Sequence, residues 1–297
     1  MIGDRRSALG YRLSAIGLMA LVAASCAGEQ KRPVAAAAPQ RIISLIPAVT
    51  ETLFAIGAGP SVVGVSAFDT WPPEVANVAR VGGLIDPDTE RILALKPDLA
   101  FLYGSQEELI RQLSRAGIAV EIYRHGGLAD IVSSVRAIGA RIGRQEQSEH
   151  VAKEIETGIA GVRARAAGLA RPSTLIVFGR EEGTLRTIYA SGGTGFIHDM
   201  VEAAGGRNVF GDVPRESVQA SLESILERAP EIILEIRASA AVHGPDWGDA
   251  ARKAWAAAPS LPAVRNNRVH VLLDERLVVP GPRVVGGMEL IAAALRK

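Results

Sequence analysis

Residues 145–170 have the sequence QEQSEHVAKEIETGIAGVRARAAGLA, and this stretch decides how the chain is organised. It contains no proline, and its apolar residues recur at spacings of three and four from Val151 to Leu169. This spacing predicts one long amphipathic helix that ends before Arg171 and Pro172. At about 1.5 Å per residue, the helix would be roughly 30 Å long, about the width of a small domain. We expect a stiff strut between two lobes; the alternative is one more helix that covers a single sheet.

On both sides of this helix, short apolar runs alternate with helical segments such as residues 50–56 and 196–204. Apolar runs separated by helices indicate parallel sheets that are covered on both faces. The sequence therefore predicts an α/β fold with two Rossmann-like lobes and parallel-rich sheets, at residues 41–144 and 171–297, joined by the helix at 145–170. The predicted strands are residues 42–46, 62–65, 99–103, 120–123, 175–178, 232–236 and 269–273.

The two predicted lobes contain a matching segment. The sequence DTERIL at 88–93 has a counterpart in SLESIL at 221–226, and a proline and an apolar strand follow each of them. Glu90 and Glu223 stand at the same distance before that proline, which is Pro97 in one segment and Pro230 in the other. This constant offset between the two segments supports two related lobes.

The composition is that of an ordinary globular protein. The chain has 297 residues, of which 48% are hydrophobic, and a formal charge of +1 at pH 7. A length of this size predicts about two domains. The near-neutral charge leaves no basic field to hold nucleic acid, and 4% aromatic residues are too few for a series of base-stacking platforms.

Residues 1–25 are predicted to be an export signal. Three arginines precede an apolar run at 13–24, which is too short to span a bilayer comfortably. The single cysteine, Cys26, follows LVAAS and resembles the acylation site of bacterial lipoproteins. Residues 26–40 are then expected to be a lipidated N-terminus and a flexible tether. The alternative is that Cys26 carries no chemistry.

Sequence signatures of catalysis are mostly missing. There is no Walker A loop, and the five histidines have no second ligand three or four residues away, so we expect neither a metal site nor a cofactor. The segment SGGTG at 191–195 precedes the predicted helix at 196–204, and its amides could meet an anion. An exported two-lobe enzyme that acts on a phosphorylated substrate therefore stays open, although such a loop more often only caps a helix.

A succession of short motifs resembles a known family. The motifs are RIISLIPAVTE at 41–51, VGVS at 63–66, WPPE at 71–74, VGG at 81–83, ERILALKPDL at 90–99 and PGPR at 280–283. In this order they are similar to the iron-siderophore and vitamin B12 class of periplasmic substrate-binding proteins, and closest in pattern to the cobalamin-binding members.

This resemblance implies an architecture and partners. It implies two α/β lobes joined by one backbone helix, and a small molecule held between the lobes with little closure. It further implies delivery to the permease dimer and ATPase of an ABC importer. The protein would be periplasmic, monomeric, anchored through Cys26, and not an enzyme. In this family an acidic residue on each lobe docks on the permease, and the matching residues are Glu90 and Glu223. The alternative is that both only stabilise the first turn of a helix.

The resemblance also assigns ligand contacts. Arg276 stands where the cobalamin binder has a tryptophan, which would place a cation in the cleft. A corrinoid such as cobalamin is the expected ligand, and haem or a ferric siderophore is the alternative. We interpret Trp71 as holding its loop to its own lobe, and we assign no role to Trp247 and Trp255 in an irregular stretch. The matching positions are Phe68, Leu84, Tyr103, Glu275, Arg276, Leu277, Val278 and Val279.

Overall fold

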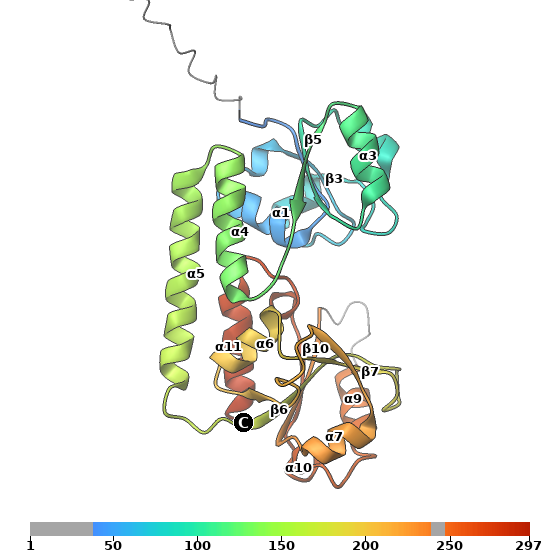
Figure 1. The fold of residues 1–297 in the computed structure, drawn as a ribbon, viewed down its shortest axis with the longest axis vertical. Helices are drawn as coiled ribbons and strands as arrows, with labels where there is room; N and C mark the ends of the chain where they lie inside the picture. The colour runs from blue at the N-terminus through green and yellow to red at the C-terminus, as the bar shows by residue number, and fades with distance from the viewer. Residues whose placement is uncertain (1–37, 239–246) are drawn as a thin grey trace, which may run out of the picture. The chain divides into compact units, whose positions relative to one another are not determined.

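The computed structural model describes residues 38–238 and 247–297. The predicted signal segment and Cys26 lie outside these residues, as does most of the predicted tether. From residue 38 onward the chain builds two sheets, one of five and one of six strands, flanked by helices (Figure 1). The two sheets are mainly parallel, which confirms the predicted fold class. We call the sheet before residue 145, with its helices, the first lobe, and the sheet after residue 170, with its helices, the second lobe.

The first lobe contains a fully parallel sheet in the order β3-β2-β1-β4-β5. Its central strand β1 is completely buried, which explains its two isoleucines, and the buried Ser44 hydroxyl donates a hydrogen bond to the carbonyl of Ile46. Four of its strands match predicted runs, whereas the two-residue β3 is too short to give a pattern. The strands are β1 Ile42–Ser44, β2 Val62–Val65, β3 Ala79–Arg80, β4 Leu99–Tyr103 and β5 Ala119–Tyr123, and the helices are α1 Pro47–Ala55, α2 Thr89–Ala94, α3 Glu107–Arg115 and α4 Leu128–Arg141, with 3-10 turns η1 Gly59–Ser61 and η2 Pro73–Asn77.

The second lobe contains a sheet in the order β11-β10-β6-β7-β9, with β8 beside β6. Strand β7 runs antiparallel to β6 and to β9, so this part of the sheet departs from the predicted parallel pattern. The eight residues between β6 and β7 are too few for the crossover that a parallel pair needs. The strands are β6 Ser173–Gly179, β7 Ile188–Ser191, β8 Arg207–Asn208, β9 Ser217–Ala220, β10 Ile232–Arg237 and β11 Val269–Leu273.

Helices also cover the second sheet, and one of them corrects a prediction. The stretch from Trp247 to Trp255 is a regular helix, α9, rather than an irregular segment. Trp255 is fully buried, and its indole Nε1 donates a hydrogen bond to Glu235 of β10 at 2.9 Å. The helices are α6 Phe196–Ala203, α7 Leu222–Arg228, α9 Trp247–Trp255, α10 Pro262–Arg265 and α11 Val284–Leu295, and the 3-10 turn η3 is Glu275–Leu277.

The long helix α5, Gln145–Ala166, connects the lobes as predicted. It packs against α4 of the first lobe and α11 of the second (Figure 1). Its buried side chains include Val151, Ile155, Ile159 and Val162, which form the predicted stripe. The helix ends four residues earlier than expected because Gly168 adopts a positive φ of 77°, and Leu169 is therefore 51% exposed. Within the described ranges, no helix is both apolar and long enough to cross a membrane.

The structure strengthens the case for two related lobes. Asp88 and Ser221 cap their helices, each accepting a hydrogen bond from the backbone N–H three residues later. After these helices, Lys96 and Ala229 both adopt a left-handed conformation, with φ of 48° and 43°. Each of them directly precedes the proline of its segment, so the repeat extends to a backbone conformation that L residues rarely adopt.

This conformation gives a stability prediction. Replacing Ala229 by glycine should raise the free energy of unfolding by about 1 kcal/mol, because glycine removes the strain of a left-handed alanine and loses only part of the gain to backbone entropy. Urea denaturation of the two proteins would measure the difference. Ala256→Gly, directly after α9 and not at a positive φ, is the control and should not stabilise. A less stable Ala229→Gly variant would contradict the prediction.

Candidate functional site

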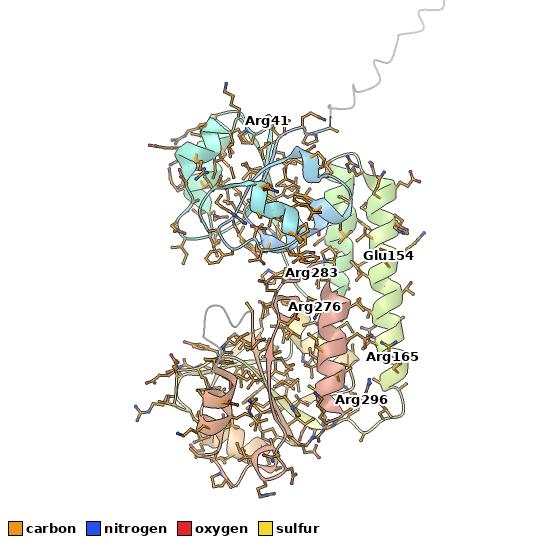
Figure 2. The ribbon with its side chains drawn as sticks, turned by 180° about the vertical axis from the view of Figure 1, so that it is seen from behind. Arg41, Glu154, Arg165, Arg276, Arg283 and Arg296 are labelled. Carbon is orange, nitrogen blue, oxygen red and sulfur yellow. The ribbon has the colours of Figure 1, made fainter. Side chains whose placement is uncertain are left out.

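A pocket of about 670 Å³ lies between the two lobes. Trp71 lines it from the loop that follows β2, whereas residues from the end of β11 through η3 and from the start of α11 form the opposite wall. The carboxyl end of a parallel strand is where α/β sheets generally bind ligands. Figure 2 shows Arg276 and Arg283 at this junction, both on the second lobe. We call this the interlobe pocket; its lining is Trp71, Ala238, Leu273, Asp274, Glu275, Arg276, Arg283 and Gly286.

Trp71 contacts the second lobe, a role that its interpretation as a residue holding its loop to its own lobe did not include. The guanidinium carbon of Arg283 lies 4.8 Å from the centroid of the Trp71 ring, a cation-π contact. The ring is 43% exposed, so a large aromatic surface faces the pocket as well as the arginine. Trp71 is therefore available for a ligand between the lobes.

Arg283 is the centre of a charged cluster between the lobes. Its Nη2 donates to Glu51 of α1, and it lies 3.6 Å from Glu275 Oε2. Thr70 Oγ1 donates to the same Glu275 oxygen at 2.5 Å. Burial raises the pKa of Glu51, and the hydrogen bond from Arg283 opposes this rise. The cluster therefore links the PGPR motif to the first lobe beside the pocket.

A second, smaller cavity of about 220 Å³ also has lining residues from both lobes. His125 enters it from the first lobe, and Phe178, Phe196 and Ile197 give the second-lobe side an apolar surface. His125 Nε2 lies 3.8 Å from Glu216 Oε1 across the junction.

The glycine-rich segment at 191–195 lines this smaller cavity, and two of its amides are already hydrogen-bonded within the second lobe. The amides of Gly192 and Gly193 donate to the carbonyls of Glu216 and Val213, at 3.1 and 2.7 Å. Both donors are already used, so they cannot also surround a phosphate. The pairing leaves the enzyme alternative without two of the amides on which its phosphate-binding loop depended.

Aromatic rings gather where β4 and β5 end. Tyr103 lies edge-on to Tyr123 and to His125, with ring centroids 6.0 and 6.2 Å apart. Burial raises the pKa of both tyrosines, so their hydroxyls stay protonated at neutral pH. Tyr123 Oη donates to the carbonyl of Pro280 at 3.4 Å, another contact between the lobes. Tyr103 was predicted as a ligand contact, whereas Tyr123 and His125 were not, although they lie at and just after the carboxyl end of a predicted strand.

Two of the three predicted ligand contacts of the first lobe, Phe68 and Leu84, are exposed apolar groups, whereas Tyr103 is half-buried. Phe68 is 68% exposed, and the ideal Cβ position of Gly83 lies 2.8 Å from its ring, so a larger residue at 83 would displace it. Leu84 is 43% exposed, and its neighbour Ile85, which sequence reasoning did not select, is 94% exposed.

The predicted contacts of the second lobe divide into two groups. Glu275 and Arg276 line the interlobe pocket. Val278 and Val279 are half-buried and pack against the core, and Leu277 is completely buried because η3 turns its side chain inward. Leu277 therefore has no surface to offer a ligand. Residues that line the pocket but were not selected include Trp71, Asp274 and Arg283.

Arg276 lines the interlobe pocket as a cation that is paired with a neighbouring carboxylate. Its Nε and Nη2 donate to the two carboxylate oxygens of Asp274 at 2.8 and 2.6 Å. This pairing lowers the pKa of Asp274 and raises that of Arg276, so both groups are charged at neutral pH. The arginine reaches the pocket already neutralised.

Glu90 and Glu223 are both exposed in the first turns of α2 and α7. Each follows the N-cap residue of its helix by two positions, so its place in the structure is compatible with both docking and helix stabilisation.

In the part of the chain that the structure describes, no three His, Cys, Asp or Glu side chains are grouped so that they could hold a metal ion.

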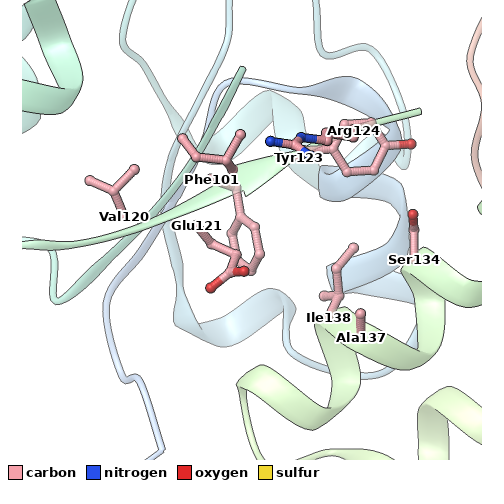
Figure 3. A pocket seen from close by; sticks show the side chains of 9 residues that line it. Phe101, Val120, Glu121, Tyr123, Arg124, Ser134, Ala137 and Ile138 are labelled. Atoms are coloured by element: carbon pink, nitrogen blue, oxygen red, sulfur yellow. The ribbon is translucent and has the colours of Figure 1, made fainter. Parts of the chain in front are cut away.

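A further cavity of about 490 Å³ lies inside the first lobe, between β5 and α4. Figure 3 shows Phe101, Tyr123 and Arg124 on its sheet side and Ser134, Ala137 and Ile138 on its helix side. All of its lining residues belong to one lobe, which separates it from the site at the junction.

Known proteins resemble this chain along most of its length. The "Periplasmic binding protein" family model matches residues 42–275. The Bacillus subtilis "Uncharacterized ABC transporter substrate-binding lipoprotein YvrC" is 27% identical over 265 residues, which is 86% of this chain and 80% of YvrC. The vitamin B12-binding protein of Salmonella typhimurium is 32% identical over 204 residues, covering 68% of this chain and 74% of its own.

A solved structure confirms the arrangement. The periplasmic haem-binding protein RhuT from Roseiflexus superposes with a TM-score of 0.73 at 27% identity, covering 86% of this chain and 97% of RhuT. These relatives are binding proteins of transporters and not enzymes. The chain therefore belongs to the periplasmic binding protein family, as a substrate-binding component of an ABC importer that works with a permease and an ATPase.

Proposed function

We propose that this protein captures a corrinoid such as cobalamin between its lobes and delivers it to an inner-membrane permease. The similarity to the vitamin B12-binding protein of Salmonella typhimurium supports this choice of ligand. The haem-binding relative RhuT supports haem as the second candidate. A ferric siderophore is a third, and it rests on the sequence resemblance alone.

The observation that carries the proposal is a concentration of exposed apolar side chains in two loops of the first lobe, one of which reaches the interlobe pocket through Trp71. Of the nine large hydrophobic side chains exposed in the described residues, four are Phe68, Trp71, Leu84 and Ile85, which lie close together in the sequence of the first lobe. Exposed apolar groups that cluster in this way usually mark a binding surface. A broad, flat macrocycle would cover them, with Tyr103 behind and Glu275 and Arg276 opposite.

Titration of the mature protein with cyanocobalamin, haem and ferric siderophores tests the proposal. Trp71 is the one tryptophan that lines the interlobe pocket in the described structure, so a ligand there should quench its fluorescence. We expect saturable quenching by cyanocobalamin at one molecule per chain. Tight binding of haem or a siderophore with no response to cyanocobalamin would contradict the corrinoid assignment.

Trp71→Ala should weaken cobalamin binding about tenfold, because it removes an aromatic surface that the ligand covers. Trp71→Phe keeps a ring over Arg283 and should lose less. Tyr189 of β7 has a similar exposure of 41% and does not line the pocket, so Tyr189→Ala is the matched control. Isothermal titration calorimetry would give the three affinities. An equal loss for Tyr189→Ala would place the ligand elsewhere.

The proposal includes delivery and anchoring. Glu90 and Glu223, one on each lobe, would form ion pairs with arginines of the permease dimer. The fixed distance between the two carboxylates would then make docking specific. Cys26, which lies outside the described residues, would carry the lipid that holds the protein at the membrane; the lipoprotein YvrC supports this assignment. A shift in mass of the membrane-extracted protein, absent from Cys26→Ser, would test the anchor.

A further inference from the structure

The pair formed by Asp274 and Arg276 has a fixed geometry at the edge of the interlobe pocket. Besides the two side-chain bonds, Asp274 Oδ1 accepts a hydrogen bond from the backbone N–H of Arg276 at 2.9 Å. The arginine lies along the first turn of α11, where an ideal Cβ at Gly286 would stand 2.9 Å from Arg276 Nη1. A larger residue at 286 would push the guanidinium away. The side chain is thus held against the helix and against its carboxylate.

The second arginine of the pocket is also paired. Arg283 contacts Glu51 and lies near Glu275, so two guanidinium groups face three carboxylates, those of Glu51, Asp274 and Glu275. Whether Glu51 is ionised or protonated, the five groups have no net positive charge. Both arginines that line this pocket are therefore paired with carboxylates, and Arg276 is the one held by two side-chain hydrogen bonds to a single carboxylate.

A pocket lining with no net positive charge favours neutral polar groups of a ligand over carboxylates. A carboxylate that enters the pocket must either displace Asp274 from Arg276 or lie beside Asp274 and Glu275 in a site partly shielded from water. A primary amide avoids both costs, because its NH₂ donates to the carboxylates and its oxygen accepts from the guanidinium edges. Corrinoids carry amides around the ring, whereas haem carries two carboxylates.

From these observations we infer that Asp274 sets the ligand preference of the interlobe pocket, by neutralising Arg276 so that the pocket accepts an amide-bearing face and rejects a carboxylate-bearing one. The inference rests on the proposed function and names the property of the ligand that the site selects. Asp274 is therefore a specificity-determining residue. Without its carboxylate, Arg276 would be able to bind an anionic group of a ligand.

The test compares one macrocycle in two charge states. The probes are cyanocobalamin and its separated monocarboxylates, in which one peripheral amide has been hydrolysed. For the natural sequence, we expect at least one monocarboxylate to bind about tenfold more weakly than the parent, because its charge falls in this pocket. Asp274→Asn keeps an N-cap acceptor and removes the charge, so it should abolish or reverse that difference.

Two further variants separate the local pair from other effects. Asp274→Asn with Arg276→Gln is again neutral and should restore the preference for the amide. Asp249→Asn breaks an Asp–Arg pair on the exposed face of α9, changes the net charge equally, and should behave as the natural sequence does.

Each outcome decides a separate claim. Equal binding of the parent and every monocarboxylate would overturn the inference, as would an unchanged preference in Asp274→Asn or the same shift in Asp249→Asn. Failure of the natural protein to bind any corrinoid would instead refute the proposed function, and the inference with it.

Discussion

Replacing Glu235 by glutamine is expected to lower the free energy of unfolding by about 3–5 kcal/mol, the largest effect on stability that we predict for a single substitution. Glu235 of β10 is completely buried, and its Oε1 accepts from Arg180 Nε at 2.9 Å and from Arg237 Nη2 at 3.2 Å. Its Oε2 accepts from Trp255 Nε1 at 2.9 Å. One carboxylate therefore serves three donors on different elements.

Glutamine has the same shape but cannot satisfy this arrangement. Either orientation of its amide turns an NH₂ group toward an N–H donor, and the buried guanidinium groups lose their counter-charge. Burial already lowers the pKa of Arg237, a sign that its charge is costly in this position. The stability of the fold therefore depends on the negative charge at residue 235, which faces Arg180 and Arg237.

Urea denaturation would measure the effect, with Glu108→Gln as the matched control. Glu108 accepts hydrogen bonds from Arg111 on the exposed face of α3, where loss of an ion pair typically costs less than about 1 kcal/mol. A Glu235→Gln protein within about 0.5 kcal/mol of the original would show that the buried cluster contributes little net stability.

The second large effect is expected in transport. Changing both Glu90 and Glu223 to alanine should reduce uptake at least tenfold, if they are the charged contacts with the permease that we propose. Ligand affinity should stay the same, because neither residue lines a pocket described above. Each single variant should lie between the double variant and the original protein.

Uptake of labelled cobalamin, measured beside affinity and thermal stability, would separate docking from helix stabilisation. Loss of a first-turn carboxylate alone costs about 0.3–1 kcal/mol of stability and would not halt transport. Glu154 is an exposed glutamate of α5 (Figure 2), and Glu154→Ala is the control for charge removal. Full uptake by a folded double variant would show that the two glutamates only stabilise the first turns of α2 and α7.

Much of the fold could be predicted because local patterns determine it. The buried parallel strand β4 is an uninterrupted apolar run, β10 is apolar apart from Glu235 and Arg237, and the stripe of α5 repeats at helical spacing. The antiparallel strand β7 could not be predicted in this way, since its direction depends on the length of a loop and not on its own composition.

The site was less predictable because its contacts join distant parts of the chain. Arg283 belongs to a motif found in the sequence, but its partner Glu51 is 232 residues away. Trp71 was assigned to its own lobe for the same reason. In contrast, the neutralisation of Arg276 had a local signal, because Asp274 stands only two residues earlier and caps the same turn.

A crystal structure of the mature protein with cyanocobalamin would test most directly that the ligand binds between the lobes. We predict a corrin ring bounded by Trp71 and Phe68 on one side and by Glu275 and Arg276 on the other. A corrin bound instead in the cavity between β5 and α4, or an empty junction at saturating ligand, would contradict the account.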